Sequence, residues 1–275
     1  MDRMQALYAR AERDGSVSTA SLRHHLLASG LQADDSRLAQ TFQQLNRLGD
    51  GPLSLEAFSS LVGPELLMVS RALHQHLVIP EWQDFLQDID YLFRRVSANR
   101  SGTNADYIPI LRDADPERWG VAICSVDGQR LALGDVDQYH SIQSVSKPIT
   151  YAYALNREGP EFTHRHVGVE PSGLPFNDLS LLADRRPFNP NVNAGAIMMA
   201  GLVTSGFPER DAREITGQLM NLWAELCGHC GPVRFSDITM ESEQATADTN
   251  FAIAYLLQGG IGLPRGVDLQ KMLDV

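Results

Sequence analysis

Apolar residues recur at three- and four-residue spacing through the first part of the chain, and short polar loops separate the apolar runs. The spacing is clearest in two groups, Leu22, Leu26 and Leu27 and then Leu38, Phe42 and Leu45. Because it places apolar side chains on one face of a helix, residues 1–76 are predicted to form helices only. A further helix is expected at about residues 81–97, before a cluster of turn-forming residues.

Two Asp-Gly pairs, Asp14-Gly15 and Asp50-Gly51, lie between these helices, and each is followed by a Ser and an apolar run. This rhythm is typical of paired EF-hands. A calcium loop also needs oxygen ligands at alternating positions and a bidentate Glu at its end. The first loop runs out of ligands after Ser16, and the second has Pro52 where a ligand should be. We therefore predict an EF-hand-like packing or assembly module without evident calcium loops.

The pattern changes after residue 102. Residues 119–126 and 130–134 alternate as two strands joined by a tight turn at Asp127-Gly128. Helices are predicted beyond them at about 144–157, 192–205, 211–227 and 243–257. With no βαβ repeat and no Gly-rich phosphate loop, the fold class is predicted as α+β. The expected domains are the helical module, 1–76, and a second domain, 77–275.

Composition and charge exclude several classes of protein. Hydrophobic residues make up 43% of the sequence and charged residues 21%, which is ordinary for a folded globular chain. The formal net charge of -11 makes nucleic acid and anionic membrane poor partners, because both carry negative charge. No apolar stretch of signal-peptide or membrane-spanning length is present, so a cytoplasmic location is expected.

The chain has three cysteines, Cys124, Cys227 and Cys230, which are too few and too unevenly spaced for a disulfide framework. Cys227, His229 and Cys230 resemble half of a zinc or redox motif, but no second pair at ligand spacing accompanies them. We interpret them as structural residues, and we expect neither a metal site nor a cofactor.

The basic residues are unevenly chosen, because the chain has 21 Arg and only two Lys, Lys147 and Lys271. Arg cannot lose its proton in a protein. A Lys that is retained in such a chain is therefore a candidate for a group that has to lose its proton. Lys147 lies three residues after Ser144, about one helical turn. An unprotonated Lys amine on the same helix face could accept the proton of the Ser144 hydroxyl. A solvated Lys at a helix N-terminus is the alternative.

Several further motifs occur in a fixed order around this pair. They read YIP at 107–109, WGV at 119–121, DGQR at 127–130, QSVSKP at 143–148, EPSG at 170–173, FN at 176–177, NPNVNAGAI at 189–197 and a final run at 243–253. Together they resemble the serine-dependent glutaminases, and the N-terminal region is similar to that of the longer members, which carry an EF-hand-like helical module. The resemblance covers nearly the whole chain.

The resemblance implies a fold similar to that of serine β-lactamases and the hydrolysis of L-glutamine through a glutamyl ester. By motif, it makes Ser144 the nucleophile and Lys147 its activator. It places Tyr107, Gln143, Ser144, Asn193, Glu243 and Asn250 in the substrate pocket. Family members form dimers or tetramers, so a homo-oligomer is expected.

The chemistry of these residues agrees with a free amino acid as substrate. Its ammonium group would pair with the carboxylate of Glu243, and its carboxylate would accept hydrogen bonds from the amides of Asn193 and Asn250. Each residue also has a plainer interpretation. Asn193 could be a helix N-cap, Glu243 a solvated carboxylate at a helix start, and Tyr107 a packed aromatic.

The sequence stops at Val275 within an amphipathic pattern and without a capping residue. Members of the family continue with two Tyr side chains, one of which partners the Ser/Lys pair, and with a late strand that supplies an N–H to the oxyanion hole. We therefore expect an incomplete catalytic domain and doubtful activity.

Two other functions stay open on the sequence. A non-catalytic assembly or regulatory fragment of a glutaminase is one, and a penicillin-interactive or β-lactamase-like enzyme is the other, because it shares Ser-x-x-Lys.

Overall fold

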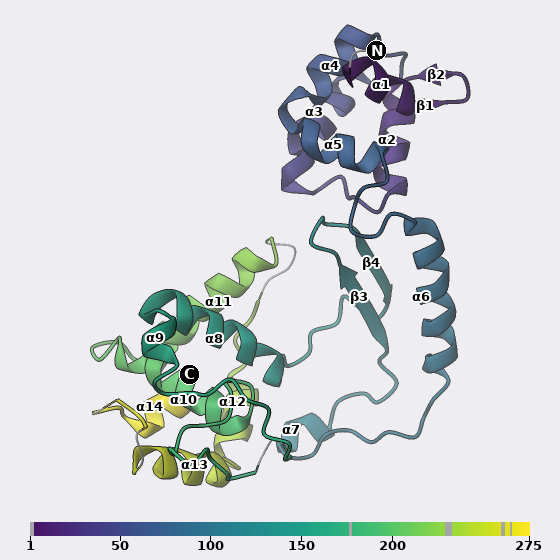
Figure 1. Ribbon diagram of the computed structural model, residues 1–275. Coiled ribbons are helices and arrows are strands. Elements are labelled where there is room, and N and C mark those ends of the chain that lie inside the picture. Colours follow the sequence, from purple (N-terminus) through teal and green to yellow (C-terminus); the bar gives the residue numbers. More distant parts are fainter. Residues whose placement is uncertain (1–2, 176–177, 229–232, 260–261, 265) are drawn as a thin grey trace. The chain divides into compact units, whose positions relative to one another are not determined.

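The computed structural model describes residues 3–175, 178–228, 233–259, 262–264 and 266–275. The chain divides into two compact units (Figure 1). Unit 1 comprises Met1–Thr103 and Asp115–Gln138, and unit 2 comprises Asn104–Ala114 and Tyr139–Val275. The predicted hairpin lies in unit 1 with the helical module, whereas every predicted site residue lies in unit 2. The predicted domain boundary at residue 76 stays a prediction.

Unit 1 is built mainly from helices, and the apolar faces of the first five of them meet in one core. They are α1 Arg3–Arg10, α2 Thr19–Ala28, α3 Ala39–Leu48, α4 Leu55–Val62, α5 Leu66–Leu73 and α6 Trp82–Ser97, with short 3-10 turns at Ser36–Leu38 and Gly63–Glu65. The predicted spacing is confirmed, because Leu22, Leu26, Leu38, Phe42 and Leu45 are all buried. Leu27 differs, since it lies on the outer face of α2 and is 41% exposed.

The prediction of helices only in residues 1–76 is wrong. A two-residue antiparallel ladder joins β1 (Glu12–Arg13) to β2 (Ser16–Val17) across the first Asp-Gly pair. Asp14 and Gly15 both have positive φ, 54° and 79°. This backbone suits a tight hairpin turn, and Asp and Gly tolerate it well. The second Asp-Gly loop pairs with the first, because the Thr19 N–H donates to the Gly51 carbonyl at 3.0 Å.

The predicted hairpin is confirmed as β3 (Gly120–Cys124) and β4 (Arg130–Gly134), paired antiparallel with Cys124 opposite Arg130. Its turn passes through Gly128, whose φ is +85°. At the other end of the hairpin, the ring of Phe93 on α6 stacks on Trp119, with centroids 5.7 Å apart. Helix α6 therefore contacts the open end of the hairpin.

The turn of the hairpin is buried against the helical module. Asp127 is 4% exposed and forms an ion pair of 2.6 Å with Arg71 of α5. Gln129 is fully buried and hydrogen-bonds to the backbone of Ser29 and of Ile79. Polar side chains buried in this way need partners, and the module supplies them here. The hairpin and the module are thus joined by a satisfied polar interface.

Unit 2 is helical in its described part. Its helices are α7 Pro109–Arg112, α8 Lys147–Glu158, α9 Pro160–Thr163, α10 Asn193–Ser205, α11 Ala212–Leu226, α12 Asp237–Gln244, α13 Asp248–Gln258 and α14 Leu269–Leu273. Helix α10 is the most buried of them and packs against α8, α13 and α14 (Figure 1). With the strands of unit 1, these helices confirm the α+β class. None of the helices in the described ranges is long and apolar enough to cross a bilayer.

The single helix predicted at 243–257 is two helices, α12 and α13, separated by a turn. The hydroxyl of Thr246 donates to the carbonyls of Ser242 and Glu243, at 3.3 and 3.2 Å. The N–H groups of Thr246 and Ala247 donate to the carbonyls of Glu243 and Gln244, three residues before each of them, so the chain turns here, and apolar spacing does not reveal this turn. As a result, Glu243 lies in the last turn of α12 and not at a helix start.

Candidate active site

Ser144 lies in a single 3-10 turn, Gln143–Ser146, that leads directly into α8. The backbone N–H of Lys147 donates to the carbonyl of Ser144, which closes the turn. Pro148 in the first turn of α8 fixes the start of that helix. Gln143 enters the turn with a positive φ of 42°, a strained value for a residue with a side chain. The Ser144 side chain is consequently exposed at a helix beginning.

The amine of Lys147 donates a hydrogen bond of 2.6 Å to Oδ1 of Asn193. Burial lowers the pKa of Lys147, because the charged amine loses solvation there. Its one hydrogen-bond partner among the described residues is this neutral amide, so no carboxylate there stabilises the charge. In the same residues the Ser144 hydroxyl has no hydrogen-bond partner, and proton transfer between Ser144 and Lys147 stays a prediction.

Asn193 is the first residue of α10, and the interpretation of its side chain as an N-cap is wrong. The capping position belongs to Val192, which makes no side-chain cap bond. The Asn193 amide oxygen accepts from Lys147 instead, so α10 presents a polar group to the start of α8. The packing of α10 on α8 makes this approach possible.

Tyr107 and Gln143 are joined directly, because the Tyr107 hydroxyl donates to Oε1 of Gln143 at 3.1 Å. The Gln143 amide in turn donates to the hydroxyl of Ser141 at 2.7 Å. Tyr107 is 59% exposed, so its interpretation as a packed aromatic is wrong. Its ring is free to contact a ligand beside the Ser144 turn.

Glu243 is a half-buried carboxylate at the end of α12. Burial raises the pKa of Glu243, and its place near a helix C-terminus also disfavours a negative charge. Its carboxylate has no ion-pair partner in the described part of the chain. The neighbouring Ser242 hydroxyl accepts the Ile110 N–H at 3.2 Å, which fastens α12 to α7 and so to the segment of Tyr107.

Asn250 occupies the first turn of α13, a helix that packs on α10. It is half-buried, and its amide makes no hydrogen bond to the residues that the structure describes. The structure therefore brings the predicted residues together to different degrees. Direct hydrogen bonds join Lys147 to Asn193 and Tyr107 to Gln143, whereas Glu243 and Asn250 are connected to them only by helix packing.

Asn189 is a contributor that the sequence analysis did not single out. Its side chain accepts the N–H groups of Asn191 and Val192, just before α10, and donates to the carbonyl of Glu170 on a neighbouring loop. A signal was available in the repeated Asn of NPNVN, because Asn side chains hydrogen-bond backbone two or three residues ahead.

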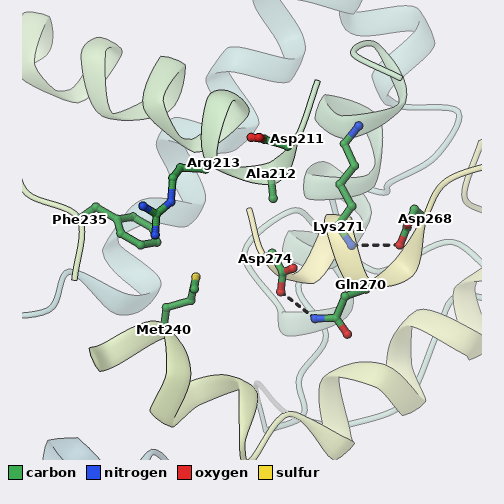
Figure 2. A pocket seen from close by; sticks show the side chains of 9 residues that line it. All are labelled: Asp211, Ala212, Arg213, Phe235, Met240, Asp268, Gln270, Lys271 and Asp274. Atoms are coloured by element: carbon green, nitrogen blue, oxygen red, sulfur yellow. Dashed lines mark hydrogen bonds between the residues drawn. The ribbon is translucent and has the colours of Figure 1, made fainter. Parts of the chain in front are cut away.

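A separate pocket of about 420 Å³ in unit 2 contains none of the predicted site residues (Figure 2). Figure 2 shows Arg213 beside Phe235 on one side and the bonded pair Gln270 and Asp274 on the other. The amine of Lys271 donates to the carbonyl of Phe207 at 2.8 Å. Because these polar groups already have partners, the pocket offers no evident site for chemistry.

The described residues contain no group of three or more His, Cys, Asp or Glu side chains placed to hold a metal ion. Cys124 and Cys227 are exposed and unpaired. His229 and Cys230 lie outside the described residues, and so does the FN motif at 176–177.

Comparison with known families gives two matches. A family model described as Glutaminase matches residues 102–275, and an EF-hand domain model matches residues 1–80.

Two relatives and one solved structure are similar along much of the chain. Putative glutaminase 3 of Caenorhabditis elegans is 34% identical over 96% of this chain and 46% of its own length. The mitochondrial liver isoform of glutaminase from Mus musculus is 34% identical over 98% of this chain and 45% of its own. The chain thus spans about half the length of these curated relatives. The crystal structure of Mglu in its glutamate form is 33% identical, has a TM-score of 0.58, and matches over 67% of this chain and 42% of that one.

Proposed function

Because the chain belongs to the glutaminase family, we propose that it hydrolyses the side-chain amide of L-glutamine to give L-glutamate and ammonia. The observation that carries this proposal is the half-buried Lys147 amine, hydrogen-bonded to the neutral amide of Asn193 at 2.6 Å. Burial lowers the pKa of this amine and no carboxylate beside it raises the pKa again, so it loses its proton more readily than a solvated Lys, as a general base must. The similarity to Mglu, which was crystallised in a glutamate form, supports the substrate.

In the proposed reaction, the Lys147 amine accepts the proton of the Ser144 hydroxyl, and the Ser144 oxygen attacks the side-chain carbonyl carbon of glutamine. The carbon–nitrogen bond then breaks, the proton passes from Lys147 to the leaving nitrogen, and ammonia departs. A glutamyl ester is left on Ser144. Water attacks this ester while Lys147 again accepts a proton, and glutamate is released from the regenerated hydroxyl.

The remaining predicted residues would recognise the amino-acid end of the substrate. Glu243 has no cation beside it in the described chain, and a substrate ammonium would supply one. The amides of Asn193 and Asn250 can donate to the substrate carboxylate, and Tyr107 and Gln143 lie bonded together beside the nucleophile turn. Burial raises the pKa of Glu243, and a substrate ammonium beside this carboxylate would favour its charged form.

Ammonia release from glutamine tests the proposal. Ser144→Ala and Lys147→Arg should each abolish it, because the first removes the nucleophile and the second supplies a cation that cannot deprotonate. Ser16→Ala, at an exposed Ser of unit 1, is the matched control and should leave the rate unchanged. If Lys147→Arg keeps most of the activity, Lys147 does not act as the general base.

A non-catalytic assembly role is the second candidate, favoured by the N-terminal helical module, which an EF-hand domain model matches over residues 1–80. The rate of ammonia release is therefore measured for the chain by itself and for its mixture with an intact homologue. Both samples are also analysed by size-exclusion chromatography. If the chain by itself releases no ammonia and co-elutes with the homologue, the assembly role is favoured. Ammonia release by the chain by itself would exclude that role. The same chromatography tests the proposed homo-oligomer.

We propose a cytoplasmic location as well. The two described cysteines are exposed and unpaired, which suits a reducing compartment. Fractionation of the source cells with an antibody to the chain tests this proposal, and recovery from a sealed organelle would overturn it.

A further inference from the structure

Two loops meet immediately before α10. The N–H of Gly168 donates to the carbonyl of Pro187 at 2.8 Å, and the N–H of Glu170 donates to that of Phe188 at 3.0 Å. The first loop follows α9 and carries the EPSG motif, whereas the second ends in the turn that starts α10. The two backbone hydrogen bonds hold the first loop beside the second, which leads into α10.

The side chain of Asn189 joins these loops to the helix start. Its Oδ1 accepts the N–H groups of Asn191 at 3.0 Å and Val192 at 3.1 Å, and its Nδ2 donates to the carbonyl of Glu170 at 2.9 Å. Since Val192 offers no side-chain cap, the turn depends on Asn189 for its order. One half-buried amide thus fixes both the turn and the neighbouring loop.

The first turn of α10 also lies very close to the Asn189 backbone. A Cβ added at Gly195 would lie 1.8 Å from the Asn189 carbonyl oxygen, a distance that no side chain can occupy. Glycine here lets the helix begin directly against the turn. Asn193 is therefore held from both sides, by the turn that precedes it and by the contact that follows it.

We propose that Asn189 is a positioning residue that holds the amide of Asn193 against the amine of Lys147. Asn189 touches neither reacting atom, and its effect passes through the α10 start, where the 2.6 Å bond from Lys147 to Asn193 is made. The catalytic consequence rests on the proposed function, but the positioning does not. A displacement of about 1 Å at a reacting group can cost about a hundredfold in rate, so a small shift of α10 would suffice.

The two lysines make a direct measurement possible. In protein labelled with [ε-¹³C]lysine, only Lys147 and Lys271 give lysine signals, and Lys271→Arg assigns them. Titration of the Lys147 signal with pH then reports the surroundings of its amine without any need for activity. The variants to compare are Asn189→Ala, Asn193→Ala and the double variant, with Asn191→Ala as the matched control.

The proposal makes a definite expectation for this cycle. Asn189→Ala should move the Lys147 titration in the same direction as Asn193→Ala, and the double variant should equal Asn193→Ala, because the two residues act in series. Asn191→Ala should have no effect, since its backbone N–H still reaches Asn189. An unchanged titration in Asn189→Ala, or a further shift in the double variant, would overturn the proposal.

Asn189→Ser covers the case in which Asn189→Ala does not fold. Its hydroxyl oxygen can accept N–H groups of the turn, while the donor bond to Glu170 is lost and no charge is added. The Lys147 titration should therefore stay closer to the parent, and a shift as large as in Asn193→Ala would count against the proposal. Rates are measured in parallel, with kcat/KM expected to fall about tenfold or more in Asn189→Ala and to recover partly in Asn189→Ser. If the parent releases no ammonia while the titration cycle holds, the proposed function fails and the positioning role stands.

Discussion

Replacing Gln129 by Met should weaken the contact between the β3–β4 hairpin and the helical module and so destabilise unit 1. Gln129 is fully buried, and Met keeps its length while removing both polar atoms. Its amide oxygen accepts the Ile79 N–H at 3.1 Å, and its amide nitrogen donates to the carbonyls of Ser29 and Ile79 at 2.8 Å each. The substitution therefore leaves three backbone groups without their partners.

The cost follows from those three groups. A buried backbone group that loses its partner costs about 1–3 kcal/mol, and the lower end applies because Ser29 and Ile79 are only half-buried. The expected loss is about 3 kcal/mol in the free energy of unfolding of unit 1. At about 4 °C for each kcal/mol, Tm should fall by about 12 °C.

Thermal unfolding and amide hydrogen exchange measure this loss at two levels. Exchange at Ile79 should accelerate by about a hundredfold, whereas the Val78 N–H, which donates to Asp127 at 2.7 Å, should stay protected. Gln138→Met, at an exposed Gln of the same unit, is the matched control. If Gln129→Met and Gln138→Met unfold at the same temperature, the hairpin turn does not hold the module and the reasoning is refuted.

Two further expectations concern buried charge. Arg71→Met leaves the Asp127 carboxylate without its cation and should lower Tm. Adding Asp127→Asn to that variant should restore part of the lost Tm. A double variant that unfolds at a lower temperature than Arg71→Met would contradict this expectation. Burial raises the pKa of Glu243, so ionisation opposes folding, and the parent should lose stability as pH rises from about 4 through the raised value. Glu243→Gln has no carboxyl group to ionise, so its Tm should equal that of the parent at low pH and exceed it at neutral pH. The same variant should not hydrolyse glutamine. A difference in Tm between variant and parent that does not depend on pH would show that ionisation of Glu243 does not oppose folding.

Apolar spacing predicted most of the helices because burial of one face drives their formation in this chain. Leu22 and Leu26, spaced one turn apart, are both fully buried, and the helix expected at 81–97 is α6, Trp82–Ser97. The hairpin was equally visible, because alternation and Asp127-Gly128 are both local signals. Local patterns suffice where the local preference and the packing agree.

The errors arise where a short turn interrupts the pattern or where partners are distant in sequence. The turn between α12 and α13 is closed by backbone bonds from Thr246 to Glu243 and from Ala247 to Gln244, which apolar spacing does not predict. Asp14 and Gly15 form a turn whose strands are too short to show alternation. The partner of Asn193 is 46 residues away, so the sequence showed a polar residue at a helix start without showing what it faces.

The two lysines show what rarity can and cannot reveal. Both are retained in a chain with 21 Arg, so scarcity alone marks them equally. Lys271 donates to the carbonyls of Phe207 and Pro208, a task that needs donors and no loss of a proton. Lys147 is half-buried and meets only the neutral amide of Asn193 in the described chain, where its charge is costly. The composition therefore selected two candidates for a base, and Lys147 is distinguished by its place one turn after Ser144 and by the burial that lowers its pKa.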